Sequence, residues 1–82
     1  MGYAEELAKR LEEVKLKKSQ DTYEQVKYLI ASAVEQGKDF ITLSYKFFKN
    51  DNALLKYILE KGMEDGFVFK LYETQMEIHL TE

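Results

Sequence analysis

Apolar and polar residues alternate most regularly between Phe67 and Leu80, where the pattern predicts a β-hairpin that bends at Glu73-Thr74. The cross-strand pairs that follow are Tyr72–Gln75, Leu71–Met76, Lys70–Glu77, Phe69–Ile78, Val68–His79 and Phe67–Leu80. One face of the hairpin is then wholly apolar and the other is mixed. A slip of one residue would expose the apolar face, so the pattern predicts a single register.

The N-terminal part of the chain shows helical spacing instead. Leu7, Leu11 and Val14 recur at intervals of four and three residues, which predicts a helix over residues 3–18. Its apolar stripe is narrow. Such a stripe suits packing against one neighbouring helix better than packing across a sheet.

A second helix is predicted after the run Ser19-Gln20-Asp21-Thr22, which supplies residues that favour helix N-termini. It extends to about Gln36 and ends at Gly37. An alternative stays open, because neither proline nor glycine occurs between Tyr3 and Gln36. A single rod of about 50 Å would then replace the two helices.

The second half of the chain adds a strand and a third helix before the hairpin. Residues 40–45 alternate as a short strand, and Asn50-Asp51-Asn52 is a strong helix N-cap for a helix that ends at Gly62 or Gly66. The predicted fold class is α+β: two N-terminal helices followed by β-α-β-β, with helices on one face of a three-stranded sheet. The favoured strand order is 1-3-2, with the first strand antiparallel to the last.

One face of this sheet is too narrow for three packed helices. Three strands make a sheet about 15 Å wide, whereas packed helices lie 8–10 Å apart, so one face accommodates roughly two helices. Residues 1–18 are therefore expected to be a dimerisation arm on a domain of residues 19–82. The expected partner is a second copy, which contacts Leu7, Leu11 and Val14 in a homodimer.

Composition narrows the class of protein. The chain has 82 residues, 45% of them hydrophobic and 33% charged, with no cysteine and one histidine. A single cytoplasmic domain is expected, without disulfides, cofactor, metal or membrane segment. His79 has no cysteine to activate and no set of carboxylates around it, and nucleotide-binding or hydrolase motifs are absent from the sequence. The chain is therefore not expected to be an enzyme.

Charge is distributed unevenly along the chain. Residues 51–82 hold seven acidic and three basic residues, and three of the acids (Glu60, Glu64 and Asp65) crowd the end of a helix, where the dipole disfavours them. Carboxylates on a rigid domain can imitate a phosphate backbone and occupy a basic DNA-binding protein. The expected protein-binding residues are Glu60, Glu64, Asp65, Glu73, Glu77 and Tyr72. Tyr72 is included because tyrosine is favoured where one side of the residue is apolar and the other contacts water.

Two resemblances bear on function. The order of elements over residues 20–82 resembles the winged helix-turn-helix family, which implies DNA binding through the helix at 50–65. The chain departs from that family in having room for one helix where the family places two, and this helix has only Lys56 and Lys61 as cations. Direct nucleic-acid binding is therefore the alternative and is disfavoured.

The residue usage, in turn, is similar to that of short proteins of low-GC Gram-positive bacteria and their phages. This resemblance implies a regulator or inhibitor that acts by binding a host protein. The function expected from the sequence is therefore a small non-enzymatic protein-binding module, homodimeric, with its acidic half as a DNA mimic.

Overall fold

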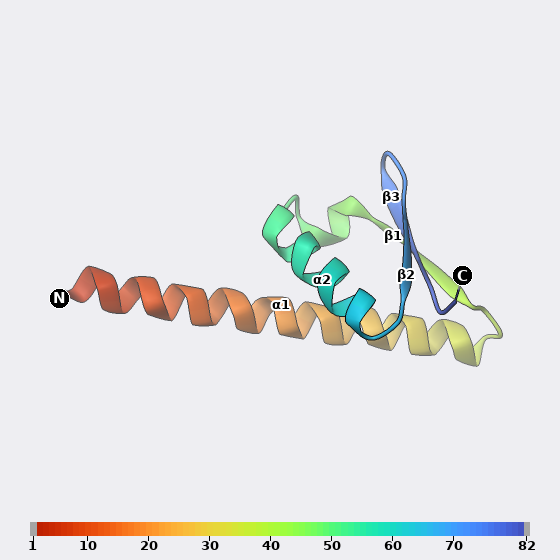
Figure 1. Ribbon diagram of the computed structural model, residues 1–82, viewed down its shortest axis with the longest axis horizontal. Helices are drawn as coiled ribbons and strands as arrows, with labels where there is room; N and C mark the ends of the chain where they lie inside the picture. Colours follow the sequence, from red (N-terminus) through yellow and green to blue (C-terminus); the bar gives the residue numbers. More distant parts are fainter. Residues whose placement is uncertain (1, 82) are drawn as a thin grey trace.

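The computed structural model describes residues 2–81 and shows an α+β fold with two α-helices and a three-stranded antiparallel sheet (Figure 1). The elements are α1 (Tyr3–Glu35), β1 (Phe40–Ser44), a 3₁₀ turn η1 (Tyr45–Phe48), α2 (Asn52–Glu64), β2 (Val68–Leu71) and β3 (Gln75–His79). The fold class expected from the sequence is confirmed at this level.

The prediction of two N-terminal helices is wrong, because α1 is one helix of 33 residues. Its length matches the longest dimension of the molecule, 53 Å. The Thr22 hydroxyl, expected near a helix start, instead donates a hydrogen bond of 2.8 Å to the carbonyl of Lys18 one turn earlier. A hydroxyl that bonds back in this way leaves the helix intact, and no proline or glycine interrupts it.

The C-terminal end of α1 lies where the sequence predicts it. Gly37 has a φ of +83°, and its N–H bonds to the Val34 carbonyl, while the N–H of Lys38 bonds to the Ala33 carbonyl, both at 2.9 Å. This pair of bonds is a Schellman motif, which satisfies carbonyls at the helix end and needs a residue that tolerates positive φ.

The sheet confirms the expected order and register. Its strands run β1-β3-β2, and β2 pairs with β3 through Val68–His79, Phe69–Ile78, Lys70–Glu77 and Leu71–Met76. The N–H of Tyr72 bonds to the Gln75 carbonyl at 2.9 Å, which closes the bend at residues 73–74. The predicted Phe67–Leu80 pair lies outside the ladder, where the Leu80 N–H bonds to the Asp39 carbonyl instead.

The connection from β1 to α2 holds a short helical turn and a strong cap. Strand β1 ends one residue earlier than expected, because Tyr45 begins η1. Lys49 and Asn50 then take positive φ values of 53° and 58°. Asp51 caps α2 by accepting a hydrogen bond from the N–H of Leu54 at 3.1 Å.

Both helices pack on the same face of the sheet. The buried core joins residues of all of these elements: Tyr23, Val26 and Ile30 of α1, Ile58 of α2, Phe48 of η1, and Leu43, Met76 and Ile78 of the sheet. Because Met76 and Ile78 alternate with Glu77, the other face, with Glu77 on it, points away from the helices. Only the C-terminal half of α1 contributes to this core.

The N-terminal half of α1 extends beyond the rest of the molecule as a rod (Figure 1). Every residue from 2 to 18 is exposed, whereas burial along α1 starts at Ser19 and is complete at Tyr23. We call residues 3–18 the arm. The sheet thus seats two helices, as its width allows, and the excess is half of one helix rather than a third helix.

Candidate interaction surface

The arm carries apolar side chains that the chain itself does not cover. Leu7, Leu11 and Val14 are 46%, 53% and 46% exposed. They lie on one side of the helix because their spacing is four and then three residues. This stripe is where the sequence predicts a dimer contact, and the structure leaves it open within one copy.

The stripe continues past the arm into the folded domain. Stepping on by four, four, three and four residues from Val14 reaches Lys18, Thr22, Gln25 and Leu29 on the same side of α1. Lys18, Thr22 and Gln25 line a cleft, and Gln25 and Leu29 line a smaller adjoining hollow that Phe47 closes. The exposed stripe of the arm and these depressions therefore form one continuous strip.

The two helices diverge towards the N-terminal end of α2 (Figure 1). The residues that line the cleft come from α1, from η1 and its connection to α2, and from the first turn of α2. The cleft encloses about 680 Å³. Phe47, Phe48 and Leu54 contribute its apolar surface, and Phe48 is buried, so this floor is held rigidly by the core.

Charge around the cleft is more basic than the molecule as a whole. Lys15, Lys18 and Lys49 line it together with Asp21 and Asp51, whereas the chain has a net charge of −3. The Asp51 carboxylate also accepts the capping hydrogen bond of α2. An apolar floor with lysines at its rim is suited to an acidic amphipathic segment.

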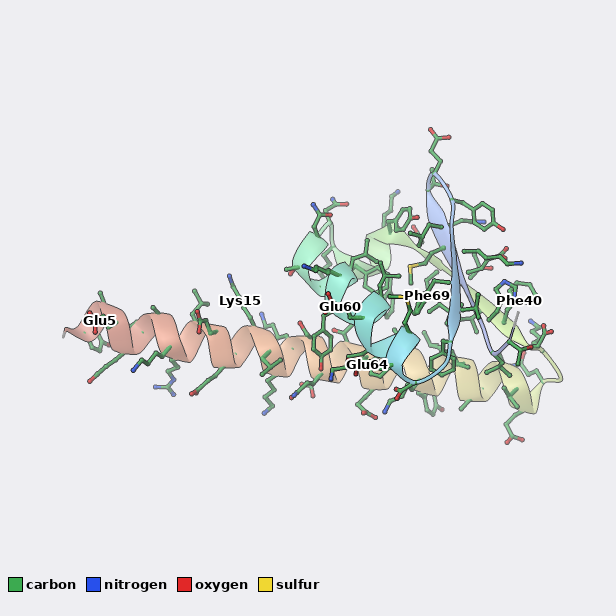
Figure 2. The ribbon with its side chains drawn as sticks, viewed as in Figure 1. Glu5, Lys15, Phe40, Glu60, Glu64 and Phe69 are labelled. Carbon is green, nitrogen blue, oxygen red and sulfur yellow. The ribbon has the colours of Figure 1, made fainter. Side chains whose placement is uncertain are left out.

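Glu60 and Glu64 lie on α2 (Figure 2), and Asp65 follows its last residue; the Glu60 and Glu64 side chains are 59% and 68% exposed. Glu60 pairs with Lys56 at 3.9 Å and Glu64 with Lys61 at 3.4 Å. Asp65 accepts a hydrogen bond from the Tyr23 hydroxyl. Each carboxylate therefore faces a donor or cation of its own chain.

The other predicted binding residues belong to the hairpin. Glu73 is exposed at the bend, and Glu77 lies on the sheet face away from the helices, within 2.8 Å of the Nε2 atom of His79. The Tyr72 hydroxyl is 3.4 Å from Glu77, and its side chain is 48% exposed. The structure thus separates this group from the carboxylates of α2, which do not share a surface with it.

His79 is mostly buried, with 17% of its side chain exposed. Its ring stacks on Phe40 with centroids 4.8 Å apart, on the side of the sheet away from α2 (Figure 2). Within residues 2–81, no group of three or more metal-ligating side chains converges. His79 therefore contributes to packing between β1 and β3.

The cleft itself could not be identified from the sequence. Lys49, Phe47 and Leu54 follow each other closely, but Lys15 and Lys18 come from a segment about thirty residues earlier. The two groups meet only because α1 continues unbroken past the domain. The only sequence signal for this was the absence of proline and glycine between Tyr3 and Gln36.

Comparison of the chain with protein families, with curated proteins and with solved structures found no match. Among residues 2–81, neither helix combines the length and apolar composition needed to cross a membrane.

Proposed function

We propose that the protein is a non-enzymatic protein-binding module that self-associates as a homodimer through its arm. The observation that carries this proposal is the apolar stripe Leu7, Leu11 and Val14 on a segment in which every residue is exposed. A helix that served only to connect or solubilise would not need three apolar residues on one side.

The energetics indicate how large the interface must be. Covering three half-exposed side chains in each of two copies contributes about 1 kcal/mol per side chain, or about 6 kcal/mol in all. Association costs an estimated 4–15 kcal/mol before any net affinity remains. A contact between the two stripes alone is therefore marginal, and a stable dimer must bury additional surface.

Sedimentation velocity at tens of micromolar tests the proposal. The wild-type chain is expected to sediment as a dimer, and the double variant Leu7→Glu/Leu11→Glu as a monomer with unchanged circular dichroism. Leu16→Glu is the matched control, because Leu16 is 51% exposed on the arm but lies off the stripe. A wild-type monomer, or a dimer that the double variant leaves intact, would contradict the proposal.

Mimicry of DNA by the acidic half of the chain has weaker support than self-association through the arm. A mimic of a phosphate backbone needs a row of carboxylates available to a basic partner. Here Asp65 is bonded to Tyr23 and Glu77 contacts His79. Glu60 and Glu64 are exposed, but Lys56 and Lys61 beside them interrupt the row of negative charge. The proposal therefore places protein binding on the arm and not on the acidic half.

Nucleic-acid binding is a second candidate, and one observation favours it. Helical turn η1 precedes α2 across a tight turn at Lys49-Asn50, so a short helical segment stands where the winged helix-turn-helix family has the first of its two helices. Lys46 lies within η1, and Lys49 lies in the turn that follows it.

Fluorescence anisotropy with a labelled DNA duplex tests this candidate. Binding that weakens steeply with salt and is reduced by Lys46→Glu/Lys49→Glu would support it. Absence of binding at 50 µM protein in low salt would remove it. Lys38→Glu, a lysine in the connection between α1 and β1, is the control variant.

A further inference from the structure

The arm has opposite charge at its two ends. Residues 3–14, the tip, hold four glutamates against Lys9 and Arg10, whereas residues 15–18, the root, hold three lysines and no acid. The root also forms part of the cleft, whose lining of three lysines and two aspartates is basic on balance. The net charge of the tip is therefore opposite in sign to that of the cleft.

Their apolar surfaces match as well. The tip presents Tyr3, Leu7 and Leu11, all exposed, and the cleft presents Phe47 and Leu54 beneath its lysines. The stripe of the arm runs continuously into the cleft along α1. A helix laid antiparallel along this strip would contact the stripe and the cleft together.

The arm of a second copy of the chain is suited to be this antiparallel helix, because the pair can then be symmetric. In an antiparallel pair Glu5 and Glu6 of each tip lie beside the basic root of the other copy, and the two contacts are equivalent in a twofold dimer. A parallel pair would place glutamates against glutamates and lysines against lysines, which is unfavourable. The antiparallel pair also buries the surface of both clefts, which adds to the area that the two stripes bury alone.

We infer that two copies exchange arms, so that the tip of each arm packs antiparallel along the arm of the other and enters its cleft. This inference rests on the self-association proposed above. It adds that the two arms are antiparallel and that the tip of each arm binds in the cleft of the other copy. The cleft is then a receptor for the chain's own N-terminal helix, and a dimer with both clefts filled has no further site for a third arm.

Disulfide trapping tests the direction of pairing, because the natural chain has no cysteine. Leu7→Cys and Lys18→Cys variants are mixed, equilibrated and oxidised mildly, and crosslinked peptides are identified by mass spectrometry. The 7–18 disulfide is expected to dominate, with loss of the signal when either variant is oxidised alone. Leu16→Cys in place of Lys18→Cys is the off-stripe control.

Charge reversal tests the complementarity independently. Glu5→Lys/Glu6→Lys alone, and Lys15→Glu/Lys18→Glu alone, are each expected to dimerise at least about tenfold more weakly than wild type. An equimolar mixture of the two variants is expected to recover the affinity, because each altered tip then meets an altered root.

The cleft is tested by Lys49→Glu, with Lys56→Glu on α2, outside the cleft, as its control. Weaker dimerisation in the first variant and not in the second supports the inference. A wild-type monomer would overturn the proposed function and this inference together. A dimer that forms the 7–7 disulfide, or one indifferent to Lys49→Glu, would overturn only the inference.

Discussion

The Tyr23 hydroxyl of α1 donates a hydrogen bond to the Asp65 carboxylate at the C-terminal end of α2. It also lies 3.3 Å from the carbonyl of Lys61. Tyr23 is only 6% exposed and is the first fully buried residue after the arm. This contact therefore joins the two helices at the position where α1 leaves the domain, and it gives Asp65 a structural role.

Replacing Tyr23 with phenylalanine is expected to destabilise the fold by about 1–2 kcal/mol, because a hydrogen bond to a carboxylate is lost while the ring remains. Urea denaturation followed by circular dichroism measures this. Asp65→Ala should cost a similar amount, and the double variant should cost less than the sum of the two. Additive effects would mean that the two groups are not coupled.

Alkaline pH should weaken the protein through the same group. Burial, with the hydrogen bond and negative charge of Asp65, raises the pKa of Tyr23 well above its ordinary value of about 10. The folded state therefore holds this proton more tightly than the unfolded state, so the stabilisation is complete below pH ~10 and is lost as the pH rises further.

The corresponding measurement is the urea midpoint between pH 8 and pH 11. Its fall above pH ~10 should be shallower in Tyr23→Phe than in the wild-type chain. Equal slopes for the two proteins would show that Tyr23 does not contribute to the alkaline loss.

Gly62 should not tolerate alanine, because a methyl group there would overlap the ring of Phe69 on β2. Overpacking costs about 1–3 kcal/mol, against a gain of up to ~1 kcal/mol in helix propensity. We expect a net loss of about 1–2 kcal/mol in chemical denaturation. Met63→Ala, at the next residue, is the control, because Met63 is 61% exposed.

A smaller side chain without a ring at position 69 should recover part of the stability that Gly62→Ala loses. Gly62→Ala combined with Phe69→Leu should be less destabilised than the sum of the single variants, since the overlap is relieved. Strict additivity would show that the alanine methyl does not meet Phe69.

The cap of α2 should contribute measurably to stability. Asp51→Ala removes the acceptor for the Leu54 N–H and is expected to cost about 1 kcal/mol. Asp51→Asn keeps an acceptor oxygen and should cost much less. Thermal unfolding of the two variants side by side distinguishes the cap from a general effect of charge at this position.

Local patterns were sufficient for the hairpin and for several helix ends. Alternation on both sides of Glu73-Thr74 determined the pairs from Val68–His79 to Leu71–Met76, and Asp51 and Gly37 occupy the capping positions predicted for them. The strand order β1-β3-β2 also follows the sequence expectation. The hairpin pairs and these two caps depend on residues close in sequence, whose preferences act before the chain is packed.

Local patterns failed where a competing interaction was decisive. The polar run before Thr22 favours a helix start, yet the Thr22 hydroxyl bonds to the Lys18 carbonyl and α1 continues. The spacing of Leu55 and Leu59 favours Met63 on the buried side of α2, but Gly62 faces the sheet instead and Met63 is exposed. In each case the same residue suits two local roles, and packing selects one of them.

The sequence alone determined the register of the hairpin, the caps and the apolar stripe of the arm, because each is set by the spacing of neighbouring residues. Only the tertiary structure decided that α1 is continuous, that Tyr23 reaches Asp65, and that Lys18 and Lys49 border one cleft. The physical reason for the last two is that they bring together residues about thirty to forty positions apart. Their geometry depends on the angle between two packed helices, which no local pattern encodes.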